Sequence, residues 1–144
     1  MPKPLWILVA NGSRARLLQR DHPGAALREI MDWVHPQTRE HLGTPDSAHR
    51  TSGMRGRSGL AAPESPKAHA RAQFAHDIRA WLSQAVAAQG VGRLAVFASN
   101  PFLGDLRASG EAELDKLLCA SHPLDLTGLT LPELEERLHQ HFRL

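Results

Sequence analysis

The sequence contains a single cysteine and no long hydrophobic run. Cys119 stands alone among 144 residues, so no intrachain disulfide can form and a metal site built on cysteines is excluded. The longest apolar run, Leu5 to Ala10, is far shorter than the roughly 20 residues that a membrane span needs. Asn11-Gly12-Ser13-Arg14 follows it, instead of the small residues of a signal cleavage site. We therefore expect a cytoplasmic protein that does not insert into a membrane.

The usual signatures of catalytic and metal sites are also missing. The sequence has no Gly-x-Ser-x-Gly nucleophile elbow and no His-Glu-x-x-His pattern. The glycine-rich stretch from Gly53 to Gly59 lacks the Gly-Lys-Ser/Thr ending of a phosphate-binding loop. His69 and His76 would share a helix face, but seven residues separate them by roughly 10 Å along the axis, which is too far for one metal ion. We expect no metal, no cofactor and no catalytic residue, and an enzymatic activity is left open.

The composition is that of a folded chain, with 42% hydrophobic and 22% charged residues, and its length suits one domain over 1–144. The net charge of +2 is too small to indicate a nucleic-acid partner by itself. Its distribution is more informative. From His49 to His76 there are five cations and one acid, whereas from Pro101 to Leu144 there are four cations and eight acids. The sequence therefore predicts one basic and one acidic region.

The first part of the chain predicts a three-stranded meander. Leu5 to Ala10 is typical of a strand buried on both faces, and Asn11-Gly12 is a strong hairpin signal because both residues tolerate positive φ. A second strand is expected from Ala15 to Arg20. After the turn at Asp21 to Gly24, a third is expected from Leu27 to Val34.

The second part alternates helices with strands. Ser65 and Pro66 begin a helix with an apolar stripe that ends at Gly90, and a buried strand follows at Arg93 to Ala98. Thr130 to Glu133 forms a capping box at the start of the last helix. The remaining expected elements are helices over 102–109 and 112–118 and a short strand over 119–124. The order βββ-α-β-α-β-α predicts an α/β fold with a mixed sheet of about five strands flanked by helices.

A long segment at about 35–64 shows no hydrophobic periodicity, and we expect it to be a flexible loop. Arginine recognises phosphate with two parallel hydrogen bonds, and glycines let a backbone approach it closely. The candidate residues for binding RNA or another anion are Arg50, Arg55, Gly56, Arg57, Lys67 and Arg71. A solvated loop with incidental charge is the alternative interpretation. A secondary surface is predicted at Asn11, Ser13, Arg14 and Arg107.

Several segments of the chain, in this order, resemble one protein family. These segments are Trp6 to Arg16, Arg55-Gly56-Arg57, Phe74-Ala75, Leu94 to Ala98, Pro101 to Arg107 and Asp125-Leu126-Thr127. Together they resemble the bacterial host attachment family, described as proteins required for attachment to host cells. The resemblance covers nearly the whole chain.

That family is in turn similar to the middle domain of archaeal and eukaryotic class 1 peptide-chain release factors. The resemblance implies a mixed sheet flanked by helices, with the loop before the long helix corresponding to the catalytic loop of those factors. Their loop carries a Gly-Gly-Gln signature, whereas Met54 to Gly59 contains no glutamine here. This departure argues against hydrolysis of peptidyl-tRNA by the same mechanism.

Our leading hypothesis is a non-enzymatic cytosolic binding protein of the host attachment family. It would contact ribosomal or transfer RNA through the basic Arg/Gly loop. One alternative is a regulatory adaptor in attachment to host cells or surfaces, which implies a protein partner in that pathway. The other alternative is a peptidyl-tRNA hydrolase or esterase.

Overall fold

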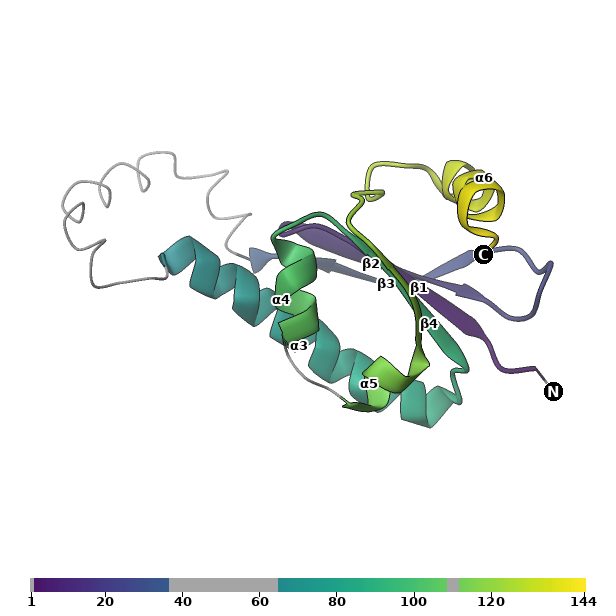
Figure 1. Cartoon of the computed structure of the whole chain (residues 1–144), viewed down its shortest axis with the longest axis horizontal. Helices are drawn as coiled ribbons and strands as arrows, with labels where there is room; N and C mark the ends of the chain where they lie inside the picture. Colours follow the sequence, from purple (N-terminus) through teal and green to yellow (C-terminus); the bar gives the residue numbers. More distant parts are fainter. Residues whose placement is uncertain (1, 37–64, 109–111) are drawn as a thin grey trace.

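The computed structural model describes residues 2–36, 65–108 and 112–144, which form a mixed sheet with helices on both faces (Figure 1). The strand order in the sheet is β3-β2-β1-β4-β5. β1 pairs with β4 and β4 with β5 in parallel, while the meander pairs β1 with β2 and β2 with β3 in antiparallel. The strands are β1 (Leu5–Ala10), β2 (Arg14–Arg20), β3 (Arg28–Val34), β4 (Arg93–Ala98) and β5 (Leu118–His122). The predicted α/β class and mixed sheet are confirmed.

In the described part of the chain, helices cover both faces of the sheet (Figure 1). α3 (Pro66–Gln89), α4 (Phe102–Ala108) and α5 (Ala112–Leu117) lie on the same side. α6 (Leu131–Phe142) packs on the opposite side. In the described part of the chain, no helix has both the length and the apolar character needed to cross a bilayer.

β1 is buried along its whole length, as its continuous apolar sequence predicts. Alternation along the strand sends Trp6 and Leu8 toward α3, and Ile7 and Val9 toward α6. The sheet therefore separates two hydrophobic cores. On the α3 side, Trp6 stacks on Trp81 with ring centroids 6.0 Å apart.

The helix boundaries follow the capping signals in the sequence. Ser65 Oγ accepts a hydrogen bond from the backbone N–H of Ala68 at the start of α3. Gly90 ends that helix in the left-handed conformation, with a φ of 66°. At α6, Thr130 and Glu133 exchange the two hydrogen bonds of the predicted capping box.

The β1–β2 hairpin forms as predicted, but a different device closes its turn. Neither Asn11 nor Gly12 has positive φ. Instead, Asn11 Oδ1 accepts hydrogen bonds from the backbone N–H groups of Ser13 and Arg14, at 2.8 and 2.9 Å. These two hydrogen bonds close the turn without the positive φ angles that the Asn-Gly pair predicts.

Other differences from the predicted boundaries are small. β2 begins one residue early, and β5 starts at Leu118 and ends at His122 instead of spanning 119–124. The larger part of the predicted loop at 35–64 lies outside the described residues, and the extent of the domain stays a prediction.

Candidate functional site

A polar cluster lies at the end of the sheet where the parallel strands β1 and β4 finish. Ligands of open α/β sheets commonly bind beyond these carboxyl ends. Asn11 follows β1 directly, and its Nδ2 donates to Asp125 Oδ2 at 3.0 Å and to Thr127 Oγ1 at 3.1 Å. Asn11 thus joins the hairpin turn to the chain beyond β5. We call this group, with Ser13, Arg14, Arg71 and Asp105, the sheet-end cluster.

Arg71 reaches the sheet-end cluster from α3. Its Nε donates to Asp105 Oδ2 of α4 at 2.5 Å. Its aliphatic stem lies over Gly12, because a Cβ at that glycine would come within 3.4 Å of Arg71 Cδ. The ion pair and the close approach place Arg71 against the hairpin turn. The guanidinium carries five N–H donors, and the contact with Asp105 uses one of them.

The end of β3 is fixed beside the same turn. The backbone N–H of His35 donates to Ser13 O at 2.9 Å, and His35 Nε2 lies 3.1 Å from Ala70 O in α3. The described residues on either side of 37–64 are therefore held next to the sheet-end cluster. Lys67, one turn before Arg71, is exposed in the first turn of α3.

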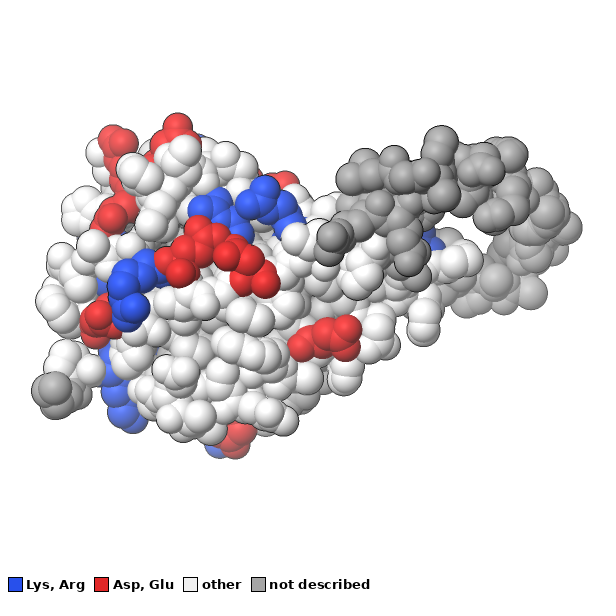
Figure 2. Space-filling view, turned by 180° about the vertical axis from the view of Figure 1, so that it is seen from behind, with Lys and Arg blue, Asp and Glu red and all other residues white. Residues whose placement is uncertain are grey.

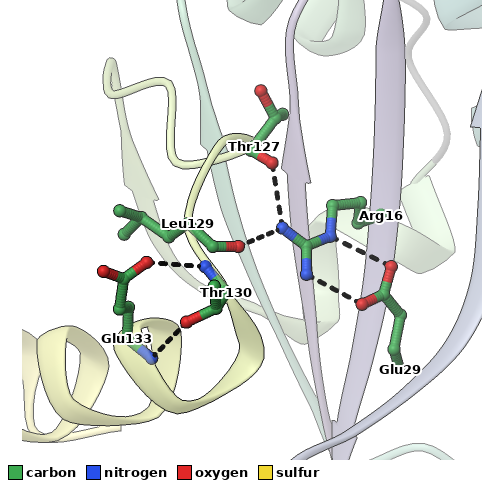
Figure 3. A network of polar contacts seen from close by, with 6 residues as sticks. All are labelled: Arg16, Glu29, Thr127, Leu129, Thr130 and Glu133. Carbon is green, nitrogen blue, oxygen red and sulfur yellow. Dashed lines mark hydrogen bonds and ion pairs between the residues drawn. The ribbon is translucent and has the colours of Figure 1, made fainter.

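A neighbouring network holds the segment before α6 on the sheet (Figure 3). Arg16 of β2 binds Glu29 of β3 with Nε and Nη2, at 3.0 and 2.8 Å. Its Nη1 donates to the carbonyl oxygens of Thr127 and Leu129, at 2.9 and 2.6 Å. Arg16 is 7% exposed. Arg14 and Arg16 both lie on β2, but the sequence does not predict that Arg16 is buried and has a structural role.

The carboxylates around these arginines ionise differently. The hydrogen bond from Arg16 lowers the pKa of Glu29 to about 2. The hydrogen bond to Glu29, together with burial, raises the pKa of Asp32 to about 6. Burial favours the neutral form of Asp125, but hydrogen bonds from Asn11 and Thr127 outweigh it and hold the pKa of Asp125 below its usual value.

The structure brings together part of the predicted site. Asn11, Ser13, Arg14 and Arg71 meet in the sheet-end cluster, with Lys67 one turn away. Arg107 points elsewhere and lines a cavity beside Arg79. The predicted residues Arg50, Arg55, Gly56 and Arg57 lie outside the described residues.

Acidic groups accompany the basic ones. Asp105 and Asp125 stand among the cations of the sheet-end cluster, and on the face seen in Figure 2 basic side chains lie next to acidic ones. Within the ranges that the structure describes, no group of three or more His, Cys, Asp or Glu residues is arranged to hold a metal ion. The arrangement provides hydrogen-bond donors and acceptors of both signs.

Sequence reasoning did not select Asp105, Asp125 and Thr127 as site residues. Asp105 lies in the helix that follows β4, and Asp125 and Thr127 follow β5. Their position after parallel strands is a signal that could have identified them. The segments that carry the family resemblance supply most of the sheet-end cluster, since Asn11, Asp105 and Asp125 come from three of them.

Two solved structures from Aquifex aeolicus are similar to this chain: a member of the Ppx/GppA family and the type II variant of the Ppx/GppA phosphatase. Each is 12% identical and matches 84% of this chain, with TM-scores of 0.42 and 0.41. The matched region spans 35% of the length of those proteins. No curated protein matches the chain.

The sequence profile of one family covers most of the chain. This family is described as "Protein required for attachment to host cells", and its profile matches residues 6–138. The relation to the middle domain of release factors stays a prediction. The matched range includes β1 except Leu5, the other described strands, and α6 up to Leu138. This chain therefore belongs to the family of proteins required for attachment to host cells.

Proposed function

We propose that this attachment-family protein binds RNA, ribosomal or transfer RNA, at the end of the sheet that carries the sheet-end cluster. Arg14 and Lys67 are exposed there, and Arg71 is held by its ion pair with Asp105. Each can contact a phosphate group, and arginine can do so with two hydrogen bonds. Ser13, also exposed, adds a hydroxyl donor.

One observation carries the proposal. His35 is bonded to Ser13 and lies against Ala70, so the chain leaves the described fold and returns to it beside Arg14 and Lys67. The segment between these points contains Arg50, Arg55 and Arg57. The residues near which this segment joins the described fold therefore lie at the end of the sheet that carries Arg14 and Arg71. A phosphate backbone is the polyanion that such a set of arginines and glycines favours.

The acidic members of the cluster set an expectation about affinity. Asp105 and Asp125 repel a phosphate, so binding should be moderate and should strengthen when a carboxylate is removed. Asp125→Asn keeps a hydrogen-bonding side chain beside Asn11 and removes one negative charge. We expect this variant to bind RNA more tightly than the wild-type protein.

A filter-binding titration at about 50 and 200 mM salt tests the proposal, because each phosphate contact contributes about 0.7 (single strands) to 0.9 (duplex) to the slope of log affinity against log salt. The probes are unfractionated transfer RNA, ribosomal RNA and a DNA duplex. We expect Arg14→Ala/Lys67→Ala and Arg55→Ala/Arg57→Ala each to lower this slope. The matched control is Arg28→Ala/Arg93→Ala, which removes two arginines from the opposite end of the sheet.

Three results would reject the proposal: no binding to either RNA, binding that does not depend on salt, or an equal loss in the control variant. Preference for the DNA duplex would reject the assignment to RNA. Copurification of regulators or envelope proteins that resists ribonuclease, in the absence of RNA binding, would favour the adaptor alternative.

A further inference from the structure

A second site lies on the face of the sheet that carries α3, α4 and α5. These helices and strands β4 and β5 enclose a cavity of about 300 Å³. This volume is at the lower end of the range of about 300–1,000 Å³ found for small-molecule sites. The side of the sheet to which the three helices belong is visible in Figure 1.

Most of the cavity wall is apolar. Five leucines and one valine line it, among them Leu103 and Leu106 of α4 and Val96 of β4. These side chains also belong to the core on the α3 side of the sheet, so the wall is continuous with a packed interior. An apolar wall with few polar groups is typical of a ligand pocket.

The polar groups in the wall come from separate elements. Arg79 of α3 is 8% exposed, and Arg107 of α4 is exposed at the rim. Asp115 of α5 approaches Arg79 with an Nη2–Oδ1 distance of 3.5 Å, the longest of the ion pairs found in the described residues apart from Lys116–Glu113. Ser121 of β5 completes the set.

One feature suggests that the polar part of this wall is arranged for a ligand. Ser121 Oγ is buried and has no hydrogen-bond partner among the described residues, which is uncommon for a buried hydroxyl. Arg79, a buried cation, and Arg107 bring guanidinium groups to the same wall.

We propose that this cavity binds a small organic carboxylate: Arg79 and Arg107 hold the carboxylate, Ser121 Oγ donates to it, and the leucine wall holds a short apolar body. The bound carboxylate supplies an acceptor for the buried Ser121 hydroxyl, and its apolar part removes nonpolar surface from water. Asp115 competes with the ligand for Arg79. This site is separate from the proposed RNA surface, because none of the residues that line the cavity belongs to the sheet-end cluster.

Isothermal titration calorimetry on the full chain tests the site with sodium octanoate and with octanamide, which has the same tail without the charge. We expect octanoate to bind one molecule per chain, and octanamide to bind about tenfold more weakly or worse, as expected for loss of charge-assisted hydrogen bonds. Arg79→Met should lower octanoate affinity by about tenfold and remove the preference over octanamide.

Three further variants separate binding from folding. Arg107→Ala changes an exposed residue, and it should weaken octanoate binding while the far-UV circular dichroism spectrum stays unchanged. Ser121→Ala should weaken binding without lowering the melting temperature, because its hydroxyl has no hydrogen-bond partner among the described residues. Asp115→Asn should strengthen binding by removing the competing carboxylate. Arg28→Ala, on β3 at the opposite edge of the sheet from β5, is the control and should have no effect.

The proposal is overturned if octanoate produces no binding heat at about 10 mM, a concentration that would detect even a millimolar complex. It is also overturned if octanamide binds equally well. If Arg79→Met does not fold, unchanged octanoate affinity in both Arg107→Ala and Ser121→Ala rejects the site.

Discussion

Burial divides the arginines of this protein into structural and surface groups. Arg16 is buried and its donors are occupied by Glu29 and by two carbonyl oxygens, so it has little capacity to bind a ligand. Arg14, two residues earlier on the same strand face, is exposed. The two residues look equivalent in a strand pattern. Only their neighbours across the sheet and in the segment before α6 distinguish them.

Removing the Arg16 side chain should destabilise the fold. Arg16→Met leaves the carbonyl oxygens of Thr127 and Leu129 without their donor and leaves Glu29 without its partner. We expect a loss of about 2–3 kcal/mol in the free energy of unfolding, less than for a fully buried pair because Glu29 is 26% exposed. Urea unfolding measures it. Arg28→Met, which breaks the exposed pair with Asp21, is the control and should have little effect.

The Glu29–Asp32 pair predicts a pH dependence with two opposite limbs. Folded Glu29 has a pKa of about 2 against an ordinary value of 4.5, so stability rises between these values as pH increases. Folded Asp32 has a pKa of about 6 against 3.8, so the folded state binds more protons in that window and stability falls as pH increases. The contribution of this pair to the stability of the fold is therefore greatest near pH 4.

Asp32→Asn tests the falling limb, because the amide can still donate to Glu29 and cannot ionise. We expect the stability of this variant, relative to the wild-type protein, to increase from pH 4 to pH 7 in urea unfolding. Glu29→Gln should instead remove the rise below pH 4.5. If the free energy of unfolding depends on pH in the same way for the wild-type protein and Asp32→Asn over this range, the raised pKa of Asp32 is contradicted.

At the scale of elements, the capping residues at helix ends predict the helix boundaries well, because capping depends only on residues that are near in the sequence. Ser65, Gly90 and Thr130 each form a capping hydrogen bond with a backbone group no more than four residues away. The positions of the helices in sequence follow from such signals. Their positions on the sheet depend on contacts far away in the chain, such as that between Arg16 and Leu129.

Two glycines predict opposite effects of the same substitution. Gly90→Ala places a side chain on the left-handed residue that ends α3, and we expect a loss of about 1 kcal/mol. Gly104 lies within α4, has no positive φ, and has open space around its Cβ position. Gly104→Ala should therefore gain up to about 1 kcal/mol from helix propensity. Thermal or urea unfolding of both variants measures this, and a shared sign would contradict it.

At the scale of the whole molecule, the sheet forms a partition between two cores. α3, α4 and α5 cover one face, whereas α6 is the helix that covers the other face in the described chain (Figure 1). The capping box and the Arg16 contacts fix the start of α6, and its leucines pack on Ile7 and Phe97. The second core therefore depends on one short helix.

Shortening a leucine of α6 should reduce the stability of the whole fold. Leu138 is fully buried against β1 and β4, and Leu138→Ala should cost about 2–5 kcal/mol through lost burial and a cavity. Leu124→Ala, at a residue that is 38% exposed, is the matched control and should cost far less. Equal midpoints in urea for the two variants would show that α6 is not an integral part of the fold.

The sequence by itself determined the elements and the class of fold. Apolar runs identified β1 and β4, and capping residues identified both ends of α3 and the start of α6, because these signals act between near neighbours. The apolar run predicted burial on both faces of β1 without any tertiary information. The family resemblance, which rests on the order of several segments, also came from the sequence and is confirmed.

The tertiary structure alone decided which polar residues meet. Asn11 contacts Asp125 across 114 residues of sequence, and Arg71 contacts Asp105 across 34. No periodic pattern encodes such pairs, because they result from the strand order of the sheet and the packing of helices on it. The same long-range packing buried Arg16, and it enclosed Arg79 and Ser121 in a cavity that no local motif predicts.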